Sequence, residues 1–351
     1  MLSRTQMRGL EMNPAFDKNE SAKLPALHGS ATGTGSAADT SEPLSGTTAI
    51  GTTITDIDTV EKLPTVDVPF TTLPDLIAHL DTRKNIVDSV TVGNVTQSRF
   101  IVICQALQER GRLFFLAKYK LLIITIPNTP HERLHLLLYD RIVKQISPMG
   151  LEDSWVPSGA TRFPAGSSSG STTSLGEGDS GGQPIPEREG RSAWPTLVIE
   201  AGFTQSLASL RTKMRFWFAT SNHDVKIVIL AKAFPQDSTQ KRILIEQWQE
   251  NEATIIRQGA TRTRLSAMSP TMMLQPSCIQ TIKIVWSIPG VTYEDASIAL
   301  RRDLNSFNVV RGPLRLEFAR LFLRPPTSPG EHDVILPDER LQWYASLIWV
   351  E

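Results

Sequence analysis

The sequence has few cysteines and no net charge. Only Cys104 and Cys278 occur in 351 residues, too few for the disulfide framework of a small secreted protein or for a four-cysteine zinc cage. Lys and Arg number 36 and Asp and Glu number 36, so the formal net charge is zero. No overall field therefore draws the chain to nucleic acid or to an anionic membrane. Any nucleic-acid contact has to come from a local basic patch.

Long apolar runs are also absent. Runs such as LLIITI at 121–126 are far shorter than the roughly 20 residues that a membrane-spanning helix needs. The opening stretch MLSRTQMRGLEMNPAF is interrupted by charges and has no segment resembling a secretion signal. We therefore expect a soluble intracellular protein, nuclear or cytoplasmic, without membrane contact.

Two low-complexity tracts divide the chain. Residues 1–62 are rich in Gly, Ser, Thr and Ala and lack periodic apolar positions, so they cannot bury enough surface to offset the entropy of ordering. A second such tract predicts a mobile Gly/Ser loop over 164–193. The predicted organisation is a disordered arm, 1–62, a core domain, 63–290, and an extension packed on that core, 291–351.

The rest of the chain has the patterns of a mixed α/β protein. Helices are predicted over 73–80, 98–108, 129–146, 207–219, 293–304 and 339–348. Strands are predicted over 195–200, 225–231, 242–247 and 281–287, with a strand pair or one bent strand over 114–127. The order strand, helix, strand within 195–231 indicates a parallel βαβ unit.

The segment His131-Glu132-Arg133-Leu134-His135 matches the zinc-protease motif H-E-x-x-H. However, it falls in the first turn of the predicted helix, where Thr129 suits the N-cap and Glu132 completes a capping box. No third ligand follows at a zincin spacing, since Leu138 stands where the metzincin pattern has glycine. We expect these residues to be structural and keep a zinc metalloprotease as an alternative.

A second group of polar residues surrounds the βαβ unit. Glu200 ends the buried strand PTLVIE, Asp179 precedes that strand in the Gly/Ser tract, and Lys213 borders the apolar face of the next helix. Two carboxylates that meet at a sheet edge can hold Mg²⁺ or Mn²⁺, and a nearby lysine can position a water. Alternatively Asp179 is a solvated loop residue, Glu200 caps a helix and Lys213 extends to solvent.

Two longer stretches resemble a known family. YKLLIITIPNTPHERLHLLLYDRIVKQISPMGL resembles the opening of the Uma-type restriction-endonuclease family, and WPTLVIEAGFTQSLASLRTKMRFWFATSNHDVKIVIL resembles its core. Residues 63–351 also resemble a group of fungal proteins of unassigned function. The resemblance implies the PD-(D/E)xK fold, a central mixed sheet flanked by helices, here with a helical C-terminal extension. It also implies metal-dependent cleavage of phosphodiester bonds as the ancestral chemistry.

The resemblance assigns roles to individual residues. Gly178-Asp179 takes the place of the Pro-Asp dipeptide and Glu200 that of the second acid, so these two acids would bind Mg²⁺ or Mn²⁺. Gly202 stands where a strict E-x-K motif has lysine, and Lys213 matches a lysine that has migrated to the next helix. Gln205 would help to orient the substrate. The lost proline, the long Gly/Ser tract and the displaced lysine are departures from the pattern.

Two functions follow. The first is a metal-dependent nuclease with catalytic residues Asp179, Glu200, Lys213 and Gln205. A local basic patch would contact nucleic-acid phosphates through four residues, Arg211, Arg215, Arg262 and Arg264. The second is a catalytically inactive interaction module of the same fold, with the C-terminal segment LQWYASLIWVE and the N-terminal arm as partner surfaces.

Overall fold

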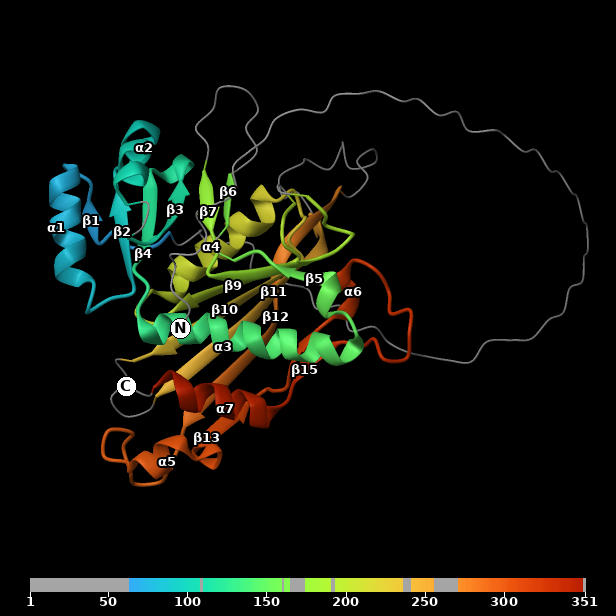
Figure 1. Ribbon diagram of the computed structural model, residues 1–351. Helices are drawn as coiled ribbons and strands as arrows, with labels where there is room; N and C mark the ends of the chain where they lie inside the picture. Colours follow the sequence, from blue (N-terminus) through green and yellow to red (C-terminus); the bar gives the residue numbers. More distant parts are fainter. Residues whose placement is uncertain are drawn as a thin grey trace, which may run out of the picture. The chain divides into compact units, whose positions relative to one another are not determined.

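The computed structural model describes residues 63–349, apart from 108–109, 160, 165–173, 191–192, 236–240 and 256–270. The described residues belong to one unit, Asp58–Glu351 (Figure 1). The predicted arm, 1–62, and the first part of the Gly/Ser tract, 165–173, lie outside the described residues. No described helix combines the length and the hydropathy needed to cross a membrane.

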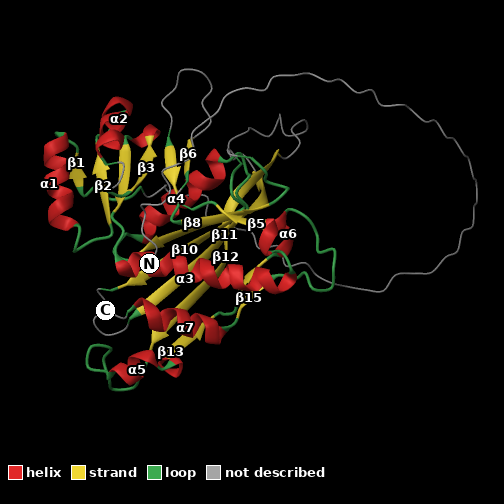
Figure 2. Ribbon diagram, viewed as in Figure 1, coloured by secondary structure: helices red, strands yellow, loops and turns green. Residues whose placement is uncertain are grey.

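A seven-stranded mixed sheet forms the centre of this unit (Figure 2). Its strands, in spatial order, are β13 (Phe307–Val310), β12 (Thr271–Trp286), β11 (Arg242–Ile255), β10 (Ile227–Phe234), β9 (Leu197–Gly202), β8 (Ser180–Pro184) and β5 (Trp155–Pro157). Only β9 and β10 pair in parallel within it, and α4 (Leu207–Thr220) connects them. The predicted βαβ unit and the general α/β class are therefore confirmed.

A second sheet packs beside the first and has six strands. In spatial order they are β1 (Val68–Pro69), β2 (Ser89–Gly93), β4 (Leu121–Thr125), β3 (Arg112–Leu116), β7 (Leu175–Glu177) and β6 (Arg162–Pro164). The segment predicted as a strand pair forms the β3–β4 hairpin. One face of this sheet packs against α1 (Leu73–Arg83) and α2 (Gln97–Ala106). Its other face shares a core with α4, β9 and β10.

The opposite face of the central sheet is covered by α3 (Thr129–Ile146) and by the C-terminal segment. That segment contains α5 (Ile298–Arg302), β13, the pair β14 (Leu314–Leu316) and β15 (Val334–Leu336), α6 (Phe318–Phe322) and α7 (Asp338–Ile348). Residues Leu341, Tyr344 and Ile348 of α7 are fully buried in the same core as α3.

The start of α3 differs from the prediction in its cap. Asn128 has extended backbone angles and its Oδ1 accepts the N–H of His131 at 2.9 Å, so Asn128 is the N-cap and Thr129 is the first helical residue. The expected capping box between Thr129 and Glu132 is therefore wrong. Because Asn128 already caps the helix, the Glu132 carboxylate is free to bind elsewhere.

Three further elements differ from their predictions. Strand β11 extends beyond the predicted residue 247 to Ile255, and its polar Glu246 is buried and paired with Arg211. The predicted helix over 293–304 shortens to α5. Strands β7 and β8 occupy 175–184, inside the tract predicted as a mobile loop.

Candidate functional site

Asp179 lies between β7 and β8, and its side chain is fully buried. Its Oδ2 accepts the backbone N–H of Ala201 at 2.8 Å, which ties it to the residue that follows Glu200 in β9. The alternative of a solvated loop aspartate is therefore wrong. The two predicted acids, which are separated by the whole β8 strand and the loop after it, are brought to the same end of β9.

Glu200 is held by two donors from α4. Its Oε2 lies 3.0 Å from Lys213 Nζ, and its Oε1 accepts the Trp217 Nε1–H at 2.7 Å. Lys213 and Trp217 are one helical turn apart, so both face β9. Lys213 Nζ also contacts Thr125 Oγ1 at 3.4 Å. Lys213 is 1% exposed and so does not extend to solvent.

His131, at the start of α3, connects Asp179 to a second buried acid. Its Nδ1 lies 3.0 Å from Asp88 Oδ2, and its Nε2 lies 3.3 Å from Asp179 Oδ1. Asp88 in turn accepts the successive backbone N–H groups of Phe203, Thr204 and Gln205. This arrangement positions the loop after β9 against the start of β2.

Gln205 belongs to that loop. Besides its backbone bond to Asp88, its Nε2 donates to Ser209 Oγ at 2.7 Å, while its buried Oε1 has no hydrogen-bond partner. The side chain thus points back to α4.

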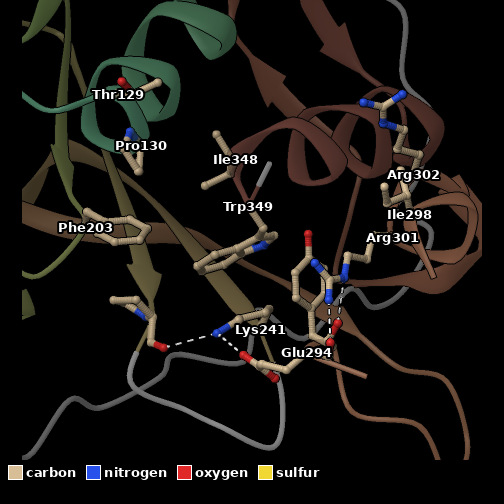
Figure 3. Close-up of a pocket in the computed structure, with 12 residues that line it drawn as sticks. Thr129, Pro130, Phe203, Lys241, Glu294, Ile298, Arg301, Arg302, Ile348 and Trp349 are labelled. Carbon is tan, nitrogen blue, oxygen red and sulfur yellow. Dashed lines mark hydrogen bonds and ion pairs between the residues drawn. The ribbon is translucent and has the colours of Figure 1, made fainter. Parts of the chain in front are cut away.

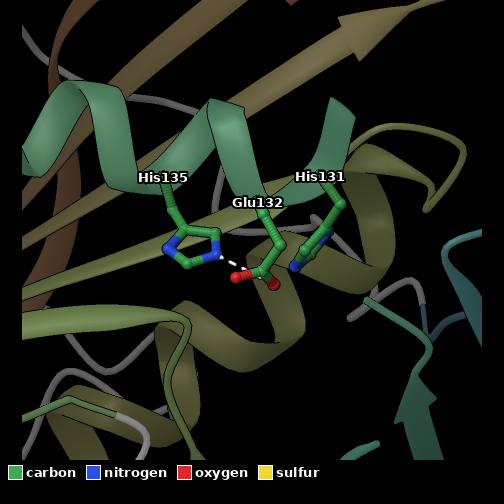
Figure 4. Close-up of side chains that lie close together, drawn as sticks. All are labelled: His131, Glu132 and His135. Carbon is green, nitrogen blue, oxygen red and sulfur yellow. Dashed lines mark ion pairs between the residues drawn. The ribbon is translucent and has the colours of Figure 1, made fainter. Parts of the chain in front are cut away.

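Three of the four polar residues of the HERLH motif, His131, Glu132 and His135, face the same way from the first turns of α3 (Figure 4). One ligand atom from each of His131, Glu132 and His135 lies within 4.8 Å of the others, so this cluster could hold a metal ion. His135 Nδ1 is 2.8 Å from Ser180 Oγ. Its Nε2 lies 3.3 Å from Glu132 Oε1 but outside hydrogen-bond geometry, which leaves this buried nitrogen without a hydrogen-bond partner.

Arg112, at the start of β3, places its guanidinium in this cluster. Its Nη1 lies 2.9 Å from Glu132 Oε1, 3.4 Å from His131 Nε2 and 3.4 Å from Asp179 Oδ1. Its Nη2 contacts the other Glu132 oxygen at 3.3 Å. A single nitrogen thus touches two of the candidate metal ligands and the predicted catalytic acid. Arg112 provides the positive charge that a metal ion would otherwise supply.

We call the buried and partly buried ionisable residues around Asp179 the charge cluster; they are Asp88, Arg112, His131, Glu132, His135, Asp179, Glu200 and Lys213. Burial and neighbouring charges shift the pKa values of its acids in opposite directions. Burial raises the pKa of Glu200 to about 7, although Lys213 opposes the shift. Burial also raises the pKa of Asp179, but the charges of His131 and Lys213 outweigh this effect and hold that pKa well below its usual value. Burial raises the pKa of Glu132, but its neighbours His135 and Arg112 lower it to about 2.

The cations respond to the same neighbours. Burial lowers the pKa of His131, but Asp179 and Asp88 reverse this and raise it to about 9. Burial also lowers the pKa of Lys213, but the charges of Glu200 and Asp179 outweigh this effect and raise that pKa above its usual value. At neutral pH the cations of Arg112, His131 and Lys213 therefore face the carboxylates of Asp88, Asp179 and Glu132.

A small pocket leads to this cluster. Its volume is about 230 Å³, and its lining includes Arg112, His135, Asp179 and Ser180. Glu200 and Lys213 are not among its lining residues and lie on the inner side of the cluster. A small molecule or ion entering from solvent would therefore meet Arg112, His135 and Asp179 first.

The predicted basic patch is placed only in part. Arg211 is paired with Glu246 through its Nε and Nη2 donors. Arg215 is partly buried on α4, and Arg262 and Arg264 lie outside the described residues.

Asp88 and Arg112 are the two members of the cluster that the sequence did not indicate. Each stands at the start of an ordinary strand and belongs to no motif. The HERLH match was the sequence signal for the two histidines. The sequence matches no protein-family model, and it matches no curated protein.

Proposed function

We propose that the chain is a metal-dependent enzyme that hydrolyses phosphodiester bonds of nucleic acids. The observation that carries the proposal is the buried cluster itself. Asp179, Glu200 and Lys213 come from three segments and lie together behind a pocket. The resemblance to the PD-(D/E)xK fold implies that these three residues meet, and their burial in one cluster supports the proposal. Strongly shifted pKa values in a cluster at the end of a pocket are typical of catalytic sites.

We place the metal beside Asp179, Glu132 and the two histidines, where the pocket ends. His135 Nε2 is buried and has no hydrogen-bond partner, so its lone pair can serve as a metal ligand. Imidazole and carboxylate together favour Mn²⁺ over Mg²⁺, because Mg²⁺ prefers oxygen ligands. When bound, such a metal supplies a water of lowered pKa as the nucleophile.

The remaining residues of the cluster have positioning roles in this proposal. Lys213 balances the charges of Glu200 and Asp179 and keeps Glu200 directed towards β9. Arg112 leaves its place among the ligands, and its planar guanidinium is then suited to bind a phosphate of the substrate. Gln205 holds the loop after β9 through Asp88 and Ser209.

A cleavage assay tests the proposal. Full-length protein is incubated with labelled single-stranded and double-stranded DNA and RNA, in Mn²⁺ and in EDTA. We expect cleavage only with Mn²⁺, and a loss of roughly 10- to 100-fold or more for Asp179→Asn and Glu200→Gln.

The matched control is Glu331→Gln, which removes a carboxylate paired with Arg324 in another loop. It should cleave like the wild type. Equal cleavage by the wild type, Asp179→Asn and Glu200→Gln would remove the proposed site.

A catalytically inactive module is the second candidate, and one observation favours it. Both oxygens of Glu200 and both oxygens of Asp179 are already bonded inside the protein, and Arg112 occupies the space between the candidate ligands. A wild-type protein that binds no Mn²⁺ and cleaves no nucleic acid would establish this alternative.

A zinc metalloprotease fits less well. Its glutamate has to be free to activate water, whereas Glu132 is held by both terminal nitrogens of Arg112. Zinc-dependent cleavage of casein that is lost in Glu132→Gln would reinstate it.

A further inference from the structure

A second cavity lies on the other side of the start of α3. Its volume is about 840 Å³, within the range of pockets that bind small molecules. Its lining comes from the first residues of α3, the loop after β9, the start of β11, α5 and the end of α7 (Figure 3). It shares no lining residue with the pocket at the cluster.

Aromatic rings form part of the wall of this cavity. The rings of Phe203 and Trp349 have centroids 5.9 Å apart and are tilted by 48°, so they are not stacked on each other (Figure 3). Both side chains are only partly buried. A flat ring can therefore pack against either of them, and tryptophan offers a large surface for such packing.

The charged side chains of the lining are mostly cationic. Three of them are positive, Lys241, Arg301 and Arg302, and one, Glu294, is negative. Lys241 and Glu294 neutralise each other across 2.6 Å. The Arg301 guanidinium is oriented by the backbone carbonyls of Tyr293 and Glu294 and lies 5.0 Å from the Tyr293 ring centroid. The lining therefore retains the positive charge of two arginines.

Arg302 is exposed, and within the described part of the chain no hydrogen bond or ion pair engages its guanidinium. An arginine in this state can bind a phosphate without first breaking an internal ion pair. Next to it Ile298 is 68% exposed on the rim, which adds an apolar surface at the entrance.

We propose that this cavity binds a nucleotide unit, with the base against Trp349 or Phe203 and the phosphate at Arg302 and Arg301. Rings alone would fit any apolar ligand and arginines alone any anion. Because one cavity is lined by both, it fits a flat ring that carries a phosphate. A free nucleotide and the end of a single strand share this chemistry. The proposal does not depend on metal binding or cleavage.

Binding to full-length protein in EDTA tests the proposal, and the absence of metal separates its outcome from that of the cleavage assay. The probes for calorimetry are AMP, adenosine, ribose 5-phosphate and a short oligodeoxyadenylate. We expect saturable binding of AMP or of the oligonucleotide. The one that binds more tightly shows whether the cavity takes a free nucleotide or the end of a single strand. Adenosine and ribose 5-phosphate should each bind more weakly by roughly tenfold or more.

Two variants locate the site. Arg302→Ala and Trp349→Leu should each weaken binding by roughly tenfold or more. Arg302 is on the surface, so that variant tests the site even if Trp349→Leu fails to fold. Arg340→Ala removes another exposed arginine, outside the lining, and should bind like the wild type. The proposal is overturned if neither AMP nor the oligodeoxyadenylate binds, if Arg302→Ala binds AMP like the wild type, or if ribose 5-phosphate binds as tightly as AMP.

Discussion

Arg112 is the residue that decides the state of the charge cluster. Its guanidinium satisfies Glu132 and also faces Asp179 and His131, and its side chain is only 14% exposed. Under the proposed function, the arginine and a divalent cation would compete for the same acidic groups. Removal of one partner from a buried ion network leaves uncompensated charge, which is costly.

Replacement of Arg112 should therefore make the protein depend on metal. We expect Arg112→Gln to lower the free energy of unfolding in EDTA by about 3 kcal/mol. Mn²⁺ should restore more of this loss in the variant than it adds to the wild type, because the cation replaces the lost charge. Thermal unfolding with and without Mn²⁺ measures both effects.

Arg188→Gln is the matched control, since Arg188 is paired with Asp224 and its side chain is 17% exposed. It should lose stability without a response to Mn²⁺ beyond that of the wild type. An equal Mn²⁺ effect on both variants would show that Arg112 does not occupy a cation site.

At the scale of elements, α3 matters most because it carries His131, Glu132 and His135. Its direction is set by its first turn, where Asn128 caps the helix and Pro130 fits a position that needs no N–H donor. The apolar residues Leu134, Leu138, Ile142 and Ile146 of the same helix are fully buried on the central sheet. The cap and this apolar face together orient the polar side chains towards Asp179.

The cap can be tested with two neighbouring substitutions. Asn128→Ala should lower the free energy of unfolding by about 1 kcal/mol, because the His131 N–H loses its acceptor. Thr129→Ala should change it by less than about 0.5 kcal/mol, since Thr129 is a helical residue and not the cap. Denaturant unfolding of both variants distinguishes them, and a larger loss for Thr129→Ala would support the capping box.

At the scale of the unit Asp58–Glu351, the cluster joins segments from both sheets. Asp88 and Arg112 belong to the six-stranded sheet, whereas Asp179 and Glu200 belong to the strands and loops of the central one. The contacts of His131 and Arg112 therefore hold the two sheets together. A change in the charge of the cluster should affect the stability of the whole unit.

The pH dependence of stability follows from the His131 pKa, which is 6.5 for the free side chain and about 9 in the fold. A raised pKa means that the folded state binds the proton more tightly, so this stabilisation is complete below pH 6.5 and is lost as the pH rises through 9. The loss is on the order of 3 kcal/mol. The raised pKa of buried Glu200 likewise makes the stability fall as the pH rises.

Denaturant unfolding in EDTA at several pH values between 6 and 9 checks this expectation. The wild type should lose stability across the range, and His131→Asn should lose clearly less. Because both proteins contain Glu200, their difference isolates His131. Parallel curves for the two proteins would show that His131 does not carry the charge assigned to it.

The C-terminal segment is also part of the packing of the whole unit. The sequence suggested LQWYASLIWVE as a partner surface, but Leu341, Tyr344 and Ile348 are fully buried in the main core. Only the end of the segment, at Trp349, opens onto a cavity. Truncation of α7 would therefore remove core packing together with any surface that it offers.

The sequence by itself determined the elements whose periodic patterns were strong. The βαβ unit and α3 follow from the spacing of their apolar residues, because burial of one face requires that spacing. The identities of Asp179, Glu200 and Lys213 as a group also came from the sequence, through the resemblance. Their convergence depends on strand pairing, which local patterns do not encode.

Only the tertiary structure decided which charges meet. Asp88 and Arg112 carry no local signal, and they became part of the cluster because strand pairing brings the starts of β2 and β3 to the start of α3. The cap at Asn128, the burial of Glu246 and the two cavities were likewise decided by packing. Contacts between distant segments depend on how the sheets align, whereas a sequence pattern reports only which face of each element is buried.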